Sequence, residues 1–393
     1  MLNNIIRKII PKQIKGYSLG IHISVIILSI FGVLMVLSAN AGIGATGKDL
    51  LIVFIKELGF TIVSYIFMLH AARRFNFKIA KKHALTLIGI TLFMLIVPLG
   101  FGSVGGAYAW IKLPGMTIQP SEFAKIIMIL IFAVYLGDRQ YNPKMKAVEL
   151  VGVPFLFLFS SVAIIFLLQK DLGSAAVMLF MTFFVFMVPV NKTITKVQTI
   201  TMILFLLGFI SVIFLSTPTG IHFLENINMP SYMYKRFLTV SDPFTDTFQS
   251  TYHVFNGFVS FVSGGLGGRG LGSSLGKHGY IPEARTDFIL AVIVEELGMF
   301  GLGIILFFYG VILFALIRNA FKMKYERDRM ILLGVAAYLM VHFLFNVGGI
   351  TALIPLTGVP LLLISSGTSS KLSFMIAIGI AQSTIAKGPK VKL

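Results

Sequence analysis

The sequence predicts an all-α integral membrane protein with ten transmembrane helices, and three observations predict it. First, 56% of the 393 residues are apolar and only 12% are charged, about half the charged share of a soluble domain. Second, ten segments hold the roughly 20 mostly apolar residues that a helix needs to cross the hydrocarbon core. Third, Lys and Arg gather in alternate loops, which is the charge bias of a multi-pass protein.

The ten segments follow one another with short connections in most places. The segments at 147–168 and 171–189 are almost continuous and are expected to form a tight helical hairpin, with Lys170 and Asp171 as an ion pair at its turn. The remaining expected spans are residues 17–40, 50–70, 83–101, 119–137, 197–216, 287–317, 329–347 and 370–386.

The charge distribution sets the expected orientation. If the N-terminus is cytoplasmic, 22 of the 33 basic residues and only four acidic ones fall on the inner side. Both termini are then cytoplasmic, and the net charge of +18 indicates topology and contact with anionic membrane lipids. It does not indicate nucleic acid. The absence of cysteine excludes disulfides, thiolate metal sites and a cysteine nucleophile.

We expect one polytopic membrane domain, residues 1–393, with a single long connection. That connection, residues 217–286, joins the seventh and eighth helices on the outer face. A loop of this length is usually functional or disordered. This one should hold short helices lying in the membrane interface and a glycine-rich stretch. It is one of three outer regions rich in polar residues; the others are residues 108–125 and 346–370.

The glycine-rich stretch reads "GLGGRG" from Gly265 to Gly270. It satisfies the spacing G-x-G-x-x-G, but no strand precedes it, so a dinucleotide site is excluded. Two readings stay open: a flexible linker, or a turn whose bare backbone approaches a ligand closely. Arg269, Lys277 and Arg285 nearby favour an anionic ligand.

The next stretch, "IPEARTDFILAVIVEELG" from Ile281 to Gly298, carries acids into an apolar segment. Asp287 either caps the helix or, half in water with a pKa low enough to be ionised, acts as a general base. Glu295 and Glu296 lie roughly 12 Å deeper, where an unpaired charge costs about 2.5–3.5 kcal/mol. They must be paired, protonated or solvated; a structural clamp to Lys125 or Lys371 is one reading.

The region before the fourth span adds further candidates. Lys125 lies about a turn inside that span and either snorkels to the interface or contacts a phosphate or one of the two glutamates. Trp110 suits an aromatic belt. The outer histidines lack metal-ligand spacing, which excludes a zinc site. As a set, the candidate substrate-binding residues are Lys112, Lys125, Arg269, Lys277, Arg285, Trp110, Gln119, Ser121 and Glu122.

Four motifs in this order on a ten-span scaffold resemble the SEDS family of cell-wall polymerases, which includes FtsW, RodA and SpoVE. They are "QPSEFAK", "DLGSA", the block Ser263–Gly298 and "PLTGVPLLLISSGTSS". The resemblance covers essentially the whole chain. The block ending in "YIPEARTDF" is similar to the FtsW branch more than to RodA.

The resemblance implies a peptidoglycan glycosyltransferase in the bacterial cytoplasmic membrane that serves cell division or cell shape. It would polymerise lipid II, an undecaprenyl-diphosphate disaccharide-pentapeptide, into β-1,4 glycan strands on the outer face. A class B penicillin-binding transpeptidase would be its partner, and Mg²⁺ or Mn²⁺ its cofactor. Asp287 matches the essential aspartate. A single displacement on the α-linked diphosphate would invert the anomeric centre, with cations stabilising the leaving group.

The chain departs from the family pattern in four places. Ala109 stands where a basic residue often precedes the tryptophan, and Lys112 can supply that charge. "QKDLG" replaces "QPDLG", Arg285 replaces a histidine, and Thr368 replaces a glycine in the late serine motif. These departures bear on which cations surround the diphosphate, and none removes the aspartate.

Two rival functions explain part of the pattern. A lipid II flippase favours inverted repeats and polar motifs on both faces, and the sequence offers neither. A passive scaffold for the transpeptidase explains the spans but not the polar outer cluster.

Overall fold

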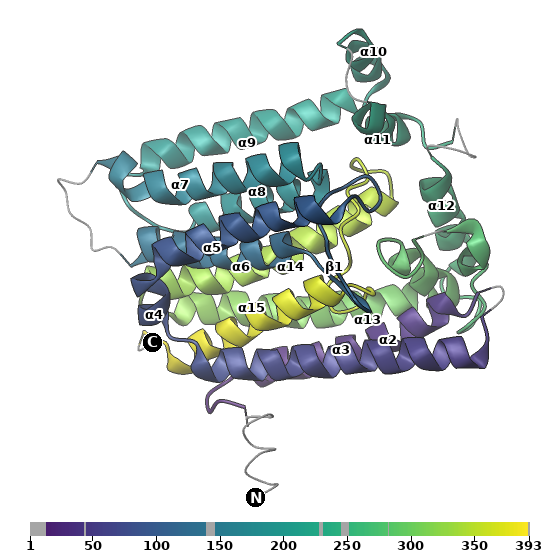
Figure 1. Ribbon diagram of the computed structural model, residues 1–393, viewed down its shortest axis with the longest axis horizontal. Helices are drawn as coiled ribbons and strands as arrows, with labels where there is room; N and C mark the ends of the chain where they lie inside the picture. The colour runs from purple at the N-terminus through teal and green to yellow at the C-terminus, as the bar shows by residue number, and fades with distance from the viewer. Residues whose placement is uncertain are drawn as a thin grey trace, which may run out of the picture.

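The computed structural model describes residues 13–42, 45–138, 146–227, 231–244, 251–281 and 283–391. Figure 1 shows long helices lying side by side in one bundle. Within the described residues, eight are long and apolar enough to cross a membrane. They are α2 (Leu19–Asn40), α3 (Gly47–Arg74), α5 (Ala84–Ile96), α6 (Pro120–Phe132), α7 (Ala147–Ala163), α9 (Thr195–Leu215), α13 (Ile289–Lys322) and α14 (Glu326–Ile350); α5, α6 and α7 are prolonged by a 3-10 or π turn to Phe101, Gly137 and Leu168.

Two further expected spans are helical but do not meet the same criteria. The segment at 171–189 forms α8 (Leu172–Phe186), which has 15 residues. The last segment forms α15 (Thr368–Lys387), which carries many polar residues among its buried positions. Eight of the ten expected spans are therefore candidates by length and composition, and the count of ten stays a prediction.

The helices differ in how far they enter the core. Nearly every residue of α6 is buried, whereas α9 has no buried residue and packs against α8 along one side, where Phe205 stacks on Phe183. α15 packs closely along α3, where a Cβ at Gly379 would lie 2.3 Å from the Met68 carbonyl oxygen. Gln382 of α15 bonds the backbone of Ser18 in both directions, at 2.8 and 3.0 Å. The first and last long helices thus begin and end at the same end of the bundle, as the expected topology requires.

The long connection contains the short helices expected of it. They are α10 (Pro218–Asn226), α11 (Ser231–Ser241) and α12 (Tyr252–Gly264), followed by a π turn at Gly276–Tyr280; residues 228–230, 245–250 and 282 lie outside the described chain. α12 packs on the start of α13, where a Cβ at Gly257 would lie 3.3 Å from the Phe288 ring. These helices gather at one end of the bundle (Figure 1).

A small hairpin at the same end was not expected. β1 (Ile111–Leu113) pairs antiparallel with β2 (Met116–Ile118), with Ile111 opposite Ile118. Pro114 and Gly115 form the two-residue turn, and Gly115 has a φ of +79°. This hairpin precedes α6. Of the candidate residues, Lys112 lies within the hairpin and Trp110 lies just before it.

Candidate active site

The three polar regions predicted to line the outer helix ends do meet in the structure. From the first region, the Gln119 amide donates to Asp171 Oδ2 at 2.8 Å. The Thr117 carbonyl accepts from Ser369 Oγ of the third region at 3.1 Å. The long connection joins the third region where the Arg285 carbonyl accepts from a backbone amide at 2.9 Å. Segments more than 200 residues apart thus build one site.

Asp287 lies at this meeting point, in the turn before α13, and is half-buried. Its backbone carbonyl accepts from Asn346 Nδ2 at 2.7 Å. A Cβ at Gly358 would lie 3.2 Å from Asp287 Oδ2. The capping interpretation is wrong, because Phe288 is the N-cap of α13 and no side-chain cap is made. The Asp287 carboxylate is therefore free of a structural task at the helix start.

Burial and neighbouring charges perturb this carboxyl group. Burial, the largest cause, raises the pKa of Asp287 to about 7; the carboxylates of Glu283 and Asp171 raise it too, and the guanidinium of Arg236 lowers it. The expected low pKa is therefore wrong, because burial removes water from around the carboxyl group and two like charges act on it. A carboxylate that titrates near neutral pH suits a general base.

A buried polar network lies behind the site, between α6 and α14. Lys125 Nζ lies 2.7 Å from Glu122 Oε1 and 2.9 Å from His342 Nε2, and Tyr338 donates to Glu122 Oε2 at 2.7 Å. Lys125 is 1% exposed, so it does not snorkel. Its contact with Glu295 or Glu296 is also excluded, because Glu122, one turn earlier on the same helix face, occupies its ammonium group.

The two intramembrane glutamates are paired, though with other partners than expected. Glu295 accepts from Ser260 Oγ at 2.9 Å and Ser274 Oγ at 2.6 Å. Glu296 accepts from Ser38 Oγ and lies 3.1 Å from Lys277 Nζ. The clamp to Lys125 or Lys371 is therefore wrong: residue 371 pairs with Glu57 of α3 instead.

The physical reason is a break in α13. Gly298 has a φ of +60°, and a Cβ there would lie 2.4 Å from the Leu266 carbonyl oxygen. This close approach lets the glycine-rich stretch fold back over both glutamates, so protein rather than lipid surrounds them. Arg269 N and Gly270 N bond the carbonyls of residues 295 and 296 at 2.9 Å each. The stretch is therefore not a free linker, and its closest backbone approach is made to α13.

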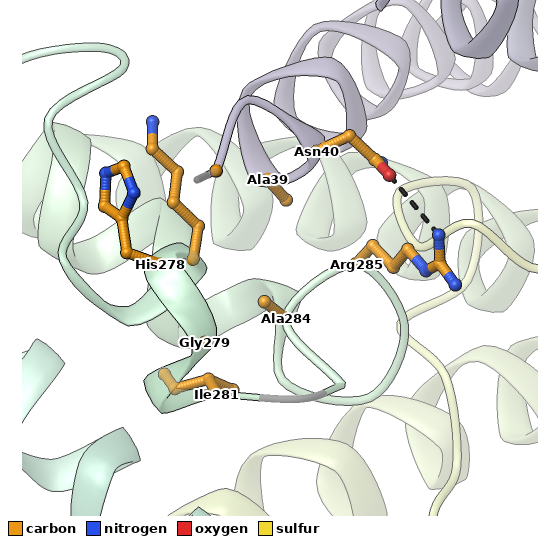
Figure 2. A pocket seen from close by; sticks show the side chains of 9 residues that line it. Ala39, Asn40, His278, Gly279, Ile281, Ala284 and Arg285 are labelled. Carbon is orange, nitrogen blue, oxygen red and sulfur yellow. Dashed lines mark hydrogen bonds between the residues drawn. The ribbon is translucent and has the colours of Figure 1, made fainter. Parts of the chain in front are cut away.

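The five candidate cations fall into two groups. Lys125 and Lys277 are buried in ion pairs, with side chains 1% exposed. Lys112, Arg269 and Arg285 are exposed. The guanidinium of Arg285 lies 3.4 Å from Asn40 Oδ1 at the end of α2, across a cavity of about 350 Å³ (Figure 2). Of these five cations, the exposed three offer a charge without breaking a buried ion pair, because Lys112 and Arg285 each make only a hydrogen bond of 3.4 Å to a neutral oxygen.

The remaining candidates line the first region. Trp110 is half-buried before β1. Ser121 is fully buried, with its Oγ 3.4 Å from Ser174 Oγ. Gln119 bonds the same serine at 3.1 Å through its amide nitrogen. The side chains of Gln119 and Ser121 therefore fix the start of α6 against α8.

Several residues at the site were missed from the sequence. The charges of Arg236, Glu283 and Asp171 act on the Asp287 carboxyl group. Asp171 accepts from Ser174 N at 3.0 Å, which caps α8, and from the Gln119 amide at 2.8 Å. The expected ion pair of Asp171 with Lys170 is wrong, because the Lys170 ammonium lies 6.0 Å from the centre of the Tyr108 ring instead. The spacing D-x-x-S at the hairpin turn was a signal for that cap. Two more are His342 and Asn346, four residues apart in a span, where polar side chains mark functional sites by default.

The described side chains offer few donors for a metal ion. Within the described residues, no group of three or more His, Asp or Glu side chains could hold a metal ion. The described side chains therefore do not form a protein-only site for the expected Mg²⁺ or Mn²⁺.

Comparison with known proteins agrees with this architecture. A family model described as "Cell cycle protein", for FtsW, RodA and SpoVE, matches residues 19–387. The probable peptidoglycan glycosyltransferase FtsW of Enterococcus hirae is 30% identical over 373 residues, covering 93% of this chain and 91% of that protein. FtsW of Bacillus subtilis (strain 168), with the same description, is 30% identical over 380 residues, covering 94% and 91%.

Two solved structures share the fold. One, from the study "Structural coordination of polymerization and crosslinking by a peptidoglycan synthase complex", has a TM-score of 0.69 and 26% identity, and the match covers 94% of this chain and 97% of that one. The rod shape determining protein RodA of Thermus thermophilus has a TM-score of 0.59 at 23% identity, with 94% and 96% covered. With its multi-pass fold and a family match over nearly its full length, the chain belongs to the SEDS family of FtsW, RodA and SpoVE.

Proposed function

We propose that the chain is a peptidoglycan glycosyltransferase that polymerises lipid II into β-1,4 glycan strands on the outer face of the cytoplasmic membrane. Relatives described as probable peptidoglycan glycosyltransferases match over almost its whole length. The observation that carries the proposal is Asp287, a carboxyl group with a pKa of about 7 where three polar regions converge at one end of the bundle.

The reaction needs a base, a stabilised leaving group and an apolar route for the lipid. The 4-hydroxyl oxygen of the acceptor sugar attacks the anomeric carbon of the donor, and its proton passes to the Asp287 carboxylate. The bond from that carbon to the diphosphate oxygen breaks, and the electron pair leaves with the lipid diphosphate. One displacement on an α-linked donor gives a β bond, so the enzyme inverts. A glycosidase-style carboxylate pair is not required, because diphosphate is already a good leaving group.

Negative charge develops on the leaving diphosphate in the transition state, and nearby cations lower the activation free energy by stabilising that charge. Lys112, Arg269 and Arg285 are exposed at the site end and are the proposed contacts. The Mg²⁺ or Mn²⁺ expected from the resemblance would arrive with the phosphates, since Mg²⁺ commonly combines one or two carboxylates with substrate phosphates and water.

The partner is proposed to be a class B penicillin-binding transpeptidase. A chain of similar structure comes from a study of a peptidoglycan synthase complex, whose title names polymerisation and crosslinking. Both termini are placed in the cytoplasm by the Lys and Arg bias. That orientation puts Asp287 on the outer side, where the glycan strand is needed.

The direct test incubates the purified full chain with fluorescent lipid II and Mg²⁺ or Mn²⁺, with and without a class B transpeptidase. Glycan strands longer than the disaccharide, separated on a gel, are expected. A flippase would move lipid II across a proteoliposome membrane without lengthening it, and a scaffold would do neither. Either of those results contradicts the proposed function.

The pH profile of polymerisation reports the base. We expect kcat/KM to rise with pH through about 7, because only the ionised Asp287 accepts a proton. Three charged groups face it: Glu283 and Asp171 raise its pKa, and Arg236 lowers it. Glu283→Gln removes one like charge, so its midpoint should move to lower pH.

Initial rates of glycan synthesis measured across the pH range for both proteins check this. Asp49→Asn is a matched control, because its carboxylate caps the exposed start of α3 through Thr46 and should leave the midpoint in place. A midpoint that stays fixed or rises in Glu283→Gln would contradict the assignment of the titrating group.

A further inference from the structure

A short loop of four residues, 357–360, is the surface against which the Asp287 carboxylate lies. Gly358 in this loop has a φ of +69°, and a Cβ there would be 3.2 Å from Asp287 Oδ2. On its other side, the loop touches the start of α8, where a Cβ at Gly173 would be 2.1 Å from the Thr357 carbonyl oxygen. With so little space on either side, the position of the loop sets the position of the carboxylate.

Two side chains of α14 hold this loop. The Asn346 amide donates to the Val359 carbonyl at 2.8 Å and to the Asp287 carbonyl at 2.7 Å, so it ties the loop to the residue that it supports. His342 lies one turn earlier on the same helix face. Its Nδ1 is 3.3 Å from the Pro360 carbonyl oxygen.

The partners of His342 fix its protonation. Lys125 Nζ lies 2.9 Å from His342 Nε2, and an ammonium group only donates. Nε2 must therefore be the bare nitrogen, and the proton sits on Nδ1, where it can be donated to Pro360. In this tautomer one neutral imidazole joins the buried ion pair of Lys125 and Glu122 to the loop beneath Asp287.

We propose that His342 is a positioning residue for Asp287, transmitting the fixed position of the buried Glu122–Lys125 pair to the loop at residues 357–360. This inference rests on the proposed function. His342 is fully buried and acts through the loop rather than on the substrate. An imidazole inside a membrane span is costly unless both nitrogens are paired, and here both are.

The test compares two substitutions at one position. His342→Leu fills the space but leaves the Pro360 carbonyl and one Lys125 hydrogen without a partner. It should lower kcat for lipid II polymerisation by about 10- to 100-fold, the scale of a misplaced reacting group, with KM unchanged. His342→Gln has one acceptor and one donor and should recover most of that loss. Recovery of kcat by Gln would show that the two hydrogen bonds of residue 342 matter, rather than the volume of its side chain.

The matched control is Gln382→Leu, at the opposite end of the bundle. Gln382 is also fully buried and also bridges two groups, the backbone N–H and carbonyl of Ser18. Gln382→Leu should lower the melting temperature in detergent by about as much as His342→Leu does, and should leave kcat within about twofold of the wild-type value. An equal loss of kcat in this control, or a Gln variant as slow as the Leu variant, would overturn the inference.

A second readout does not depend on activity. Hydrogen–deuterium exchange should become faster in peptides covering Asp287 and residues 357–360 in His342→Leu, and stay unchanged there in Gln382→Leu. Unchanged exchange in His342→Leu would overturn the positioning role. If the wild-type chain polymerises no lipid II, the proposed function fails, and the exchange comparison still decides whether His342 positions Asp287.

Discussion

Asp287→Asn should abolish lipid II polymerisation while the protein stays folded. Asparagine keeps the shape of the side chain but cannot accept the proton of the acceptor hydroxyl. Loss of a general base lowers kcat by about 100- to 10,000-fold. Initial rates with fluorescent lipid II and saturating transpeptidase would measure this, and near-normal glycan from the variant would exclude Asp287 as the base.

Stability separates this effect from unfolding, and its sign can be stated. The pKa of Asp287 is raised to about 7 in the folded protein, above the unfolded value of about 3.9. The folded state therefore binds more protons, so this group makes stability fall as pH rises between those two values and level off above 7. Asparagine removes that fall. At pH 8 the variant should melt at or above the wild-type temperature in detergent.

A control for the substitution itself is Asp328→Asn. Asp328 is buried in the first turn of α14, close to Arg327 and far from the site. Its loss should leave polymerisation near the wild-type rate. Loss of activity in both variants would point to a general effect of changing buried carboxylates rather than to the base.

The spans were predictable because their signal is local. Apolar length alone marks a helix that can enter a membrane, and the observed helices begin and end within a few residues of the expected segments. The hairpin of β1 and β2 was missed although its turn chemistry was present. Proline followed by glycine suits the two central positions of a tight turn, but the flanking strands have only three residues each.

Some of the buried ion pairs could be predicted from local spacing, and others depend on which helices pack together. Glu122 and Lys125 are three residues apart on one helix, a spacing that places side chains on one face and could have been read from the sequence. Glu57 and Lys371 come from α3 and α15, and their pairing depends on which helix faces meet. The partners of Glu295 and Glu296 depend on the break at Gly298, which no periodic pattern indicates. Asp287 could be identified from the sequence because it lies in a recognisable motif. Its raised pKa could not be predicted, because it depends on burial and on charges that the fold brings near it.

The pair of Glu122 and Lys125 gives the second large expected effect. Lys125→Met leaves Glu122, 2% exposed, without its cation, although Tyr338 still donates to it at 2.7 Å. Breaking a buried pair on one side costs about 3–5 kcal/mol. The melting temperature in detergent should therefore fall sharply, and the yield of folded protein with it.

The double variant Glu122→Gln with Lys125→Met should recover most of that stability, because no unpaired charge remains in the core. Turnover should not recover with it. Without the Lys125 ammonium, His342 Nε2 has lost its donor, and the loop beneath Asp287 is no longer tied to α6. Melting curves and polymerisation rates of the wild type, both single variants and the double variant make the comparison. If the double variant melts as low as Lys125→Met, charge neutralisation is not what Lys125 contributes; if its turnover recovers together with its stability, the pair serves the core alone.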